Sequence, residues 1–330
     1  MTGASGFIGS HLIAALAKAH GPAAVTALVH AELSTAESES AARIRALGVG
    51  VVECDLLRLP GAQPERPAFD VLYHLAGHAV TENPQGGFAV NSEGTRNLLD
   101  WLGPALSGKR VIYTGTLASV DKCDARGPIR EDTPCRPVTP YGQTKFEGEK
   151  LVQGRAAHWS YAFTILRLCT IVGPGFRPGG MFGVFPKMLR QHALATRLNW
   201  PGRVSFLHVA DLVEMLLAIP ALSQTSNEIY VTSNGDELTF DALLEQMASV
   251  LRVERKRLEL PDWLWRGLGA VAWRTASLDA TPYHSRIFCW RVSHLIRDGL
   301  YADASRLNSL LGRRLRTTQD ALREIYGQQH

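Results

Sequence analysis

The sequence predicts an α/β fold with a doubly wound parallel sheet, followed by a smaller and mostly helical C-terminal region. In the first half, short apolar runs alternate with helical stretches, and such βαβ units form parallel sheets covered on both faces. A glycine-rich turn, residues 2–9, opens directly into an amphipathic helix. Both observations favour a Rossmann-type architecture with right-handed crossovers.

The elements are expected in a regular order. Strands are predicted at 25–29, 49–52, 71–76, 110–116 and 163–168, with helices at 7–19, 41–47, 87–102 and 141–154 between them. Further helices are predicted at 182–193, 209–219, 240–251, 263–273, 303–311 and 318–326. Two Gly/Pro-rich turns near residue 175 divide a nucleotide-binding domain, 1–172, from a substrate-binding region, 173–330, with interleaving around 204–233.

One strand is missing from this scheme. A nucleotide-binding βαβ unit needs a strand before its glycine turn, yet Met1 directly precedes Thr2 and Gly3. A misplaced start or a truncated chain is the favoured explanation. Otherwise the sheet lacks a central strand and leaves backbone groups unpaired.

Composition excludes several classes of protein. The chain has 330 residues, and 45% are hydrophobic and 20% charged, as in ordinary globular proteins. The net charge of +4 does not indicate a nucleic-acid partner. Five scattered cysteines without a C-x-x-C pair favour a reducing compartment, so we expect a cytoplasmic protein with no metal site.

The glycine turn is the first candidate binding site. Gly3 permits the tight turn, Gly6 lets the backbone approach a pyrophosphate, and Gly9 allows close packing of the helix. The N-terminus of the following helix then offers amides to phosphate. The residues expected to bind the dinucleotide here are Gly3, Ser5, Gly6, Phe7, Ile8 and Gly9.

The residue at the end of the second strand indicates whether a dinucleotide site prefers NAD or NADP. An acidic residue there binds the ribose hydroxyls of NAD, but this chain has His30, which can accommodate a 2′-phosphate. NADP is therefore slightly favoured over NAD. Asp55 and Leu56 follow the third strand, where a carboxylate can meet the adenine amino group, although a turn aspartate is equally expected there.

Tyr141, Lys145 and Thr116 form the candidate catalytic group. Tyr141 and Lys145 are four residues apart and therefore share one face of a helix. A free phenol has a pKa of about 10, and a neighbouring ammonium is expected to lower it towards neutrality. Thr116, at the end of a strand, is expected to hold a substrate oxygen against Tyr141. The pattern indicates hydride transfer between a nicotinamide and a carbonyl/alcohol pair.

Taken together, these motifs resemble the extended short-chain dehydrogenase/reductases, also called the NAD-dependent epimerase/dehydratase family. The resemblance covers nearly the whole chain and includes N-x-x-G-T from Asn91, Tyr113 to Thr116, Pro140 to Lys145, and Val172-Gly173-Pro174. It implies that Asn91 supports the active site and that Gly115, in place of the usual Ser, matters little. It further implies cofactor contacts from Leu75, Ala76, Gly77, Thr114, Tyr141, Lys145 and Leu168. Dimers through helices 87–102 and 141–154 are also implied.

The substrate class is inferred from positions at which the chain departs from, or resembles, particular branches of the family. Leu117 stands where sugar-nucleotide dehydratases carry an acid, and Thr170 stands near the place where many sugar-nucleotide epimerases have an Asn. Both departures weigh against a nucleotide-sugar substrate without excluding it. The segments 260–268 and 301–307 are similar to the 3β-hydroxysteroid dehydrogenase-like branch. We therefore expect an oxidoreductase for a secondary alcohol or ketone of an apolar, sterol- or isoprenoid-like molecule. The alternatives are a nucleotide-sugar 4-epimerase and a non-catalytic NADP-binding sensor.

An apolar segment in the same C-terminal region bears on whether the protein contacts a membrane. Residues 261–274 are apolar nearly all round, for which an ordinary buried helix is slightly favoured, and a cap over an apolar substrate or a peripheral membrane contact is the alternative. No segment is long and apolar enough to predict a transmembrane span. The partners expected are therefore a small-molecule substrate and a second copy of the chain.

Overall fold

The computed structural model describes residues 1–30, 35–59, 66–78, 88–121, 127–176, 181–278 and 280–327. The chain forms two compact units. The first comprises Met1–Ser119, Thr139–Arg167 and Ala210–Tyr230, and the second comprises Val120–Val138, Leu168–Val209 and Val231–His330. The segment that returns to the first unit is thus 210–230, within the interleaving expected at 204–233. The second unit also includes 120–138, which the sequence placed in the first domain.

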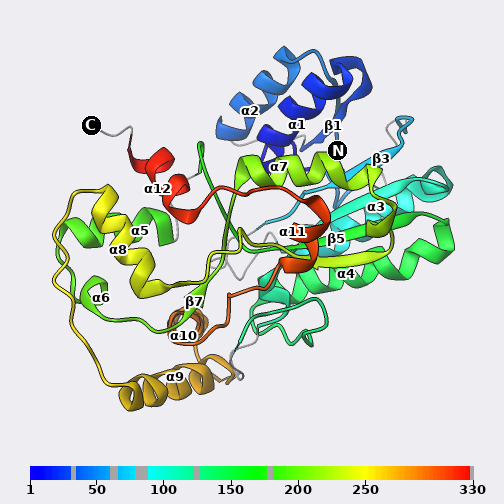
Figure 1. Ribbon diagram of the computed structural model, residues 1–330. Helices are drawn as coiled ribbons and strands as arrows, with labels where there is room; N and C mark the ends of the chain where they lie inside the picture. The colour runs from blue at the N-terminus through cyan, green and yellow to red at the C-terminus, as the bar shows by residue number, and fades with distance from the viewer. Residues whose placement is uncertain are drawn as a thin grey trace. The chain divides into compact units, whose positions relative to one another are not determined.

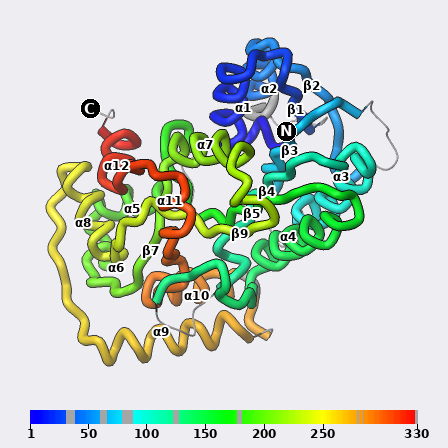
Figure 2. Tube along the Cα trace, turned by 45° about the vertical axis from the view of Figure 1, so that its right-hand side comes forward, coloured from blue at the N-terminus to red at the C-terminus, as the bar shows by residue number. Residues whose placement is uncertain are grey.

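The first unit is built on a parallel sheet, as the sequence predicts. β3 (Val71–His74), β4 (Arg110–Thr116), β5 (Ala162–Leu168) and β9 (Glu228–Val231) follow in that order across the sheet (β3 and β5 are labelled in Figure 1, and all four strands in Figure 2). β1 (Thr26–Val29) pairs in parallel with β2 (Gly50–Glu53). Only isolated bridges from Thr2, to Leu28 and to His74, connect the two groups of strands among the described residues.

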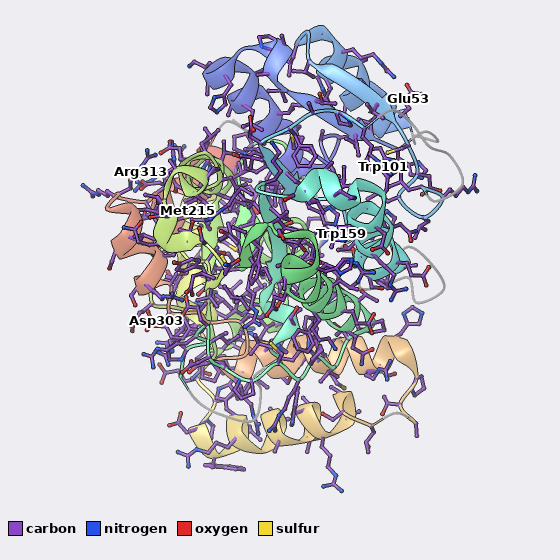
Figure 3. All side chains as sticks on the ribbon, turned by 90° about the vertical axis from the view of Figure 1, so that its right-hand side faces the viewer. Glu53, Trp101, Trp159, Met215, Asp303 and Arg313 are labelled. Atoms are coloured by element: carbon purple, nitrogen blue, oxygen red, sulfur yellow. The ribbon has the colours of Figure 1, made fainter. Side chains whose placement is uncertain are left out.

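Helices flank these strands. They are α1 (Phe7–His20), α2 (Thr35–Ala46), α3 (Thr95–Leu102), α4 (Pro140–Trp159) and α7 (Val209–Ala218). Trp101 of α3 is buried in the core that also contains Tyr113 of β4, and Trp159, at the end of α4, is partly buried against it (Figure 3). This packing orders β4 and α4, which carry Thr116, Tyr141 and Lys145, and α3, which directly follows the turn that carries Asn91.

The second unit is mostly helical around a small amount of sheet. β6 (Thr170–Val172) pairs in parallel with β8 (Phe206–His208), and β7 (Arg203–Val204) pairs antiparallel with β10 (Leu238–Thr239). The helices are α5 (Met181–Arg190), α6 (Leu194–Arg197), α8 (Phe240–Val250), α9 (Asp262–Ala276), α10 (Tyr283–Ile296), α11 (Ser305–Leu311) and α12 (Thr318–Tyr326). α9 and α10 pack against each other (Figure 2).

Some elements differ from the sequence prediction. α2 begins at Thr35 rather than at 41, and the helix predicted at 87–102 consists of a π-helical turn, Val90–Gly94, followed by α3. α10 was not predicted, because its buried face carries polar Ser293 and His294. Burial of His294 depends on Asp121, whose carboxylate Oδ1 lies 3.3 Å from His294 Nε2, and no local periodicity reveals this partner.

Candidate active site

The glycine turn at residues 2–9 is tightly folded against the start of α1. Gly3 has a φ of +72°, a conformation that L side chains rarely adopt. A Cβ at Gly9 would lie 1.9 Å from the Gly3 carbonyl oxygen. The Gly6 amide donates to that oxygen at 3.1 Å, and Gly6 caps α1 without a side chain in the way. The turn therefore exposes backbone amides at a helix N-terminus, as a phosphate requires.

The three expected catalytic residues come together at the end of β4 and the start of α4. Thr116 is the last residue of β4, and its hydroxyl is hydrogen-bonded to Tyr141. Tyr141 is held in the first turn of α4 because Thr139 caps the helix, accepting from the Gly142 amide at 3.1 Å. Lys145 is buried one turn later on the same helix.

The electrostatics of this group differ from the expectation. Burial raises the pKa of Tyr141 above its ordinary value of 10.0 and outweighs the lowering by the Thr116 hydrogen bond. The sequence-based expectation of a net lowered tyrosine pKa is therefore wrong for the chain alone. Burial also lowers the pKa of Lys145 from 10.5 to about 8, while the Glu149 carboxylate opposes that change. Both side chains are thus pushed towards their neutral forms.

Asn91 organises the loop after β3. Its Oδ1 accepts from the His78 amide at 2.9 Å, and its Nδ2 donates to the His78 carbonyl at 3.1 Å and to Thr144 Oγ1 at 3.2 Å. A Cβ at Gly77 would lie 2.6 Å from Asn91 Oδ1 and 3.5 Å from Lys145 Nζ. Asn91 therefore joins this loop to α4 and acts by positioning.

A buried ion pair beneath the catalytic group escaped the sequence analysis. Glu149, one turn after Lys145 on α4, lies with its Oε2 3.1 Å from the Nε of Arg167 on β5, and both side chains are buried. A Cβ on Gly115 would lie 2.4 Å from Glu149 Oε1. The expectation that Gly115 matters little is therefore wrong, because the carboxylate fills the space that a side chain would need. The spacing of Glu149 from Lys145 was the available signal.

The remaining predicted cofactor residues lie in several places. His30, after β1, has its Nε2 3.8 Å from Asp55 Oδ1, and Arg58 Nε lies 3.4 Å from Asp55 Oδ2. Thr114 is buried, and its hydroxyl donates to the His74 carbonyl at 3.4 Å. Of the other residues predicted to contact the cofactor, Leu56 lies in the hydrophobic core. Leu75 and Ala76 follow the carboxyl end of β3, and Leu168 ends β5.

Comparison with known proteins decides the family. The sequence profile of the NAD dependent epimerase/dehydratase family matches residues 1–232. The chain belongs to this family. UDP-glucuronate 4-epimerase 1 of Arabidopsis thaliana is 27% identical over 287 residues, which cover 79% of this chain and 67% of the relative. GDP-6-deoxy-D-mannose reductase of Pseudomonas aeruginosa is 26% identical over 79% of this chain and 82% of its own.

Solved structures of family members have the same fold. UDP-glucuronic acid 4-epimerase from Bacillus cereus, in complex with UDP-glucuronic acid and NAD, aligns with a TM-score of 0.72 at 21% identity, covering 99% of this chain and 96% of that one. RMD from Pseudomonas aeruginosa, complexed with NADPH, aligns with a TM-score of 0.66 at 21% identity, covering 98% and 96%. The chain is thus an extended short-chain dehydrogenase/reductase enzyme, from a family whose members bind NAD or NADPH.

The comparisons favour one of the substrate classes considered from sequence. These relatives carry the names of nucleotide-sugar enzymes, and the likeness to steroid dehydrogenases that the sequence suggested finds no support among them. The nucleotide-sugar alternative therefore fits better than the sterol-like expectation. In the part of the chain that the structure describes, no helix combines the length and hydropathy needed to cross a membrane.

Proposed function

We propose that the protein is an NAD(P)-dependent nucleotide-sugar 4-epimerase. The observation that carries the proposal is the hydrogen-bonded pair Thr116–Tyr141 one helical turn from buried Lys145, on the same unit as the glycine turn. Several relatives are named 4-epimerases, of UDP-glucuronate, UDP-glucose and UDP-arabinose. Leu117, which replaces the acid of the dehydratases, supports an epimerase over water elimination.

The residues present fit a dinucleotide. Cβ atoms at Gly3 and Gly9 would collide with neighbouring backbone, so the turn can close tightly at the N-terminus of α1 only with glycine at these positions, and Gly77 stands where a Cβ would crowd Asn91 and Lys145. The dinucleotide, when bound, supplies reversible hydride acceptance at its nicotinamide. We propose cofactor contacts from the glycine-turn residues, and from Leu56, Leu75, Ala76, Gly77, Thr114 and Leu168.

The chain's own residues would handle the proton. Tyr141 exchanges a proton with the sugar 4-hydroxyl, and Thr116 hydrogen-bonds the same oxygen as it gains or loses charge. The Lys145 ammonium stabilises the phenolate form of Tyr141 whenever that form is required. Each residue thus has one role, and the roles balance because the proton removed from the substrate is the proton returned.

For the cofactor we propose a preference for NADP over NAD. His30 and Arg58 both lie near Asp55 at the carboxyl-end side of β1 and β2. The His30 imidazole and the Arg58 guanidinium offer hydrogen-bond donors there, which favours an additional phosphate on the ribose. Titration of NADPH and NADH, with His30→Asp as the comparison, tests this preference, since the substitution should shift it towards NADH.

The function is tested by following epimerisation directly. UDP-glucuronate, UDP-glucose and UDP-arabinose are incubated with the protein, and the 4-epimers are quantified by ¹H NMR while absorbance at 340 nm is recorded. A 4-epimerase converts one of these sugars with no net change in NAD(P)H. Net NAD(P)H formation or consumption in proportion to product identifies a dehydrogenase or reductase and overturns the proposal.

Tyr141→Phe is the matched variant for the same assay. It removes one oxygen and keeps the ring that lies 6.4 Å from Phe88, centroid to centroid. We expect turnover to fall at least about 10³-fold, since proton exchange is lost, while NADH or NADPH affinity changes little. Loss of turnover and cofactor binding together would show that Tyr141 has a structural role instead.

A second candidate, oxidation or reduction of an apolar alcohol or ketone, rests on α9 and α10. Trp263 and Phe288 expose 72% and 67% of their surface, and Val271 is also exposed. Such side chains favour an apolar ligand or a peripheral membrane contact through 261–274, with Arg266 and Arg274 beside them. Sedimentation with anionic vesicles, for the protein and for Trp263→Ser, tests the contact. A cytoplasmic homodimer through the helices expected at 87–102 and 141–154 remains a prediction.

A further inference from the structure

Tyr113 of β4 contacts Lys145 at both ends. The Lys145 ammonium nitrogen lies over the face of the Tyr113 ring, 4.4 Å from the ring centroid. The hydroxyl of the same tyrosine donates to the Lys145 carbonyl at 3.3 Å. A single side chain of β4 therefore contacts the charged head and the backbone of Lys145.

This contact follows from the way in which β4 and α4 match. Side chains two apart on a strand share one face, and side chains four apart on a helix do the same. On one face of β4, the Tyr113 ring lies against Lys145. Two residues later, Gly115 leaves room for Glu149, whose Oε1 is 2.4 Å from the place of a Cβ. The strand thus offers a ring to the cation of α4 and an open space to its anion.

Neighbouring residues hold the Tyr113 ring in this position. A Cβ at Gly148 of α4 would lie 2.3 Å from the Tyr113 hydroxyl, so only a residue without a side chain fits there. The His74 ring lies 5.4 Å from the Tyr113 ring, centroid to centroid, at an interplanar angle of 52°. Burial, reinforced by the negative charge of Glu149, raises the pKa of Tyr113 well above 10.0. Near neutral pH the ring is therefore that of a neutral phenol.

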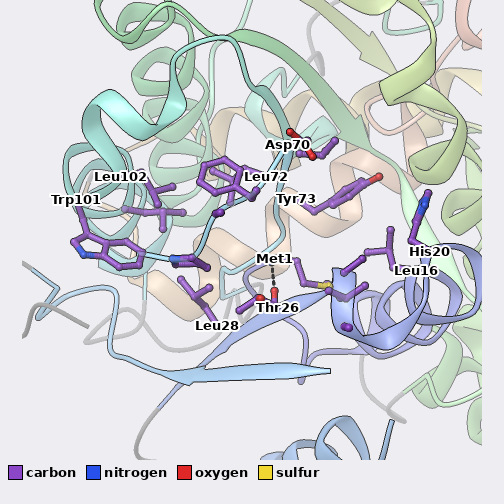
Figure 4. Close-up of a pocket in the computed structure, with 18 residues that line it drawn as sticks. Met1, Leu16, His20, Thr26, Leu28, Asp70, Leu72, Tyr73, Trp101 and Leu102 are labelled. Carbon is purple, nitrogen blue, oxygen red and sulfur yellow. Dashed lines mark hydrogen bonds between the residues drawn. The ribbon is translucent and has the colours of Figure 1, made fainter. Parts of the chain in front are cut away.

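Water screens the contact between ring and ammonium very little. Tyr113 is fully buried, and Lys145 exposes 4% of its surface. A cavity of about 480 Å³ borders β3 (Figure 4), but its lining, which includes Leu72 and Tyr73, contains neither partner of this contact. The face of an aromatic ring attracts a cation, and the attraction is strongest where both are desolvated. The ring thus offsets part of the cost of burying the ammonium.

Titratable groups of three elements surround Lys145. They are Glu149 and Tyr141 on α4 itself, Tyr113 on β4 and His74 on β3. Burial keeps His74 and both tyrosines neutral near pH 7, because it lowers the pKa of the imidazole and raises the pKa of each phenol. Among the described residues, the Tyr113 ring face and the charged form of Glu149 therefore favour the Lys145 ammonium.

We propose that Tyr113 is a positioning residue for the reaction at this site, whose ring face holds the Lys145 ammonium in place and charged, one helical turn from Tyr141. The proposal rests on the proposed epimerase function for the reaction alone, since the contact of ring and ammonium does not depend on the substrate. Tyr113 acts through Lys145 and exchanges no proton itself. A Lys145 that has lost its proton cannot stabilise the Tyr141 phenolate, so the ring face sets the upper pH limit of turnover.

A graded series of rings at position 113 of the full chain tests the proposal. Tyr113→Phe keeps the ring face and removes the hydroxyl. Phenylalanine analogues with one, two and three ring fluorines at the same position keep nearly the same size but withdraw electron density from the face, which weakens its attraction for a cation. The matched control is the same series at Phe163, a buried ring of β5 in the same core.

The Lys145 pKa and turnover are measured separately for each form. The chain has seven lysines, so ¹³C-lysine labelling gives a small set of side-chain signals, and the Lys145 signal is the one that disappears in Lys145→Met. Its titration gives the pKa without any substrate. The pH dependence of epimerisation of the UDP-sugars then gives the alkaline limit of turnover.

The pKa of Lys145, about 8 in the parent chain, should stay close to that value in Tyr113→Phe. It should then fall stepwise with fluorination, by about one unit with three fluorines, and the alkaline limit should fall with it. The Phe163 series should change neither. Equal Lys145 pKa values across the series at position 113 would overturn the proposal, and so would an alkaline limit that stays fixed while the pKa falls. A stepwise fall in a protein that epimerises no sugar would leave the positioning of Lys145 by Tyr113 standing and count against the proposed function.

Discussion

The buried His74 predicts how the fold responds to acid. His74 ends β3, and its Nδ1 and Nε2 lie 2.7 Å and 2.9 Å from the hydroxyls of Thr2 and Thr95. Thr2 also accepts from the Ala76 amide, and Thr95 donates to the Asn91 carbonyl. These bonds assign a neutral imidazole that accepts at Nδ1 and donates at Nε2. Protonating Nδ1 would therefore cost the Thr2 hydrogen bond as well as burying a charge.

The pKa of His74 gives the size of the effect. Burial, reinforced by the positive charges of Lys145 and the N-terminus, lowers it from 6.5 to about 3. Below pH 6.5 the unfolded chain binds a proton that the folded chain does not, so stability falls as the pH falls. One pKa unit corresponds to about 1.4 kcal/mol, which makes the loss about 2 kcal/mol at pH 5 and about 4 kcal/mol near pH 3.

Denaturant unfolding of the chain and of His74→Gln measures this loss. Free energies of unfolding are determined by tryptophan fluorescence at pH 7, 6 and 5. The variant should be less stable at pH 7, because its side chain fits the two hydroxyls less well, but should lose about 2 kcal/mol less than the parent between pH 7 and pH 5. The Met1 amino group also titrates in this range and cancels in the difference. Parallel pH curves for the two proteins would refute the assignment of a buried neutral His74.

Two glycines give predictions from steric contact alone. Gly115→Ser places a side chain 2.4 Å from Glu149 Oε1, so we expect a loss of about 2 kcal/mol or more of unfolding free energy in urea; Gly154→Ala, with nothing within 4 Å, is the control and should be neutral or slightly stabilising. A stable Gly115→Ser protein would contradict the geometry. Gly9→Ala pushes a methyl group to 1.9 Å from the Gly3 oxygen and should weaken NADPH binding at least about tenfold in a fluorescence titration. Unchanged affinity there would argue against a dinucleotide on this turn.

The parts of the fold and site predicted from sequence are those written in local patterns. The helices and strands of the first unit follow from apolar periodicity, and Tyr141 and Lys145 share a helix because of their spacing. α10 was missed because its buried polar side chains are stabilised by Asp121, which contacts His294 and Trp290. Asp121 lies 173 positions before His294 in the sequence, so only the folded structure reveals this partner. Tertiary partners, rather than propensity, decide such elements.

The substrate class shows a different limit. The sequence favoured an apolar substrate because 261–274 lacks a polar face, and Trp263 is indeed exposed. An exposed apolar helix, however, reports only on what touches that helix. The names of relatives matched over 79% of the chain point to nucleotide sugars instead. A surface feature outside the reacting groups was therefore a weak guide to the reaction.

The catalytic electrostatics show why the ion pair beneath the site matters. Sequence reasoning gave Lys145 the task of lowering the tyrosine pKa, but burial opposes the charged form of both groups. Burial raises the pKa of the Glu149 carboxyl and outweighs the lowering by Arg167, and Glu149 in its charged form favours the Lys145 ammonium. The charge available to stabilise a Tyr141 phenolate thus depends on a chain of buried partners reaching from α4 to β5. Gly115 belongs to this arrangement of buried partners, because only glycine at position 115 leaves room for the Glu149 carboxylate.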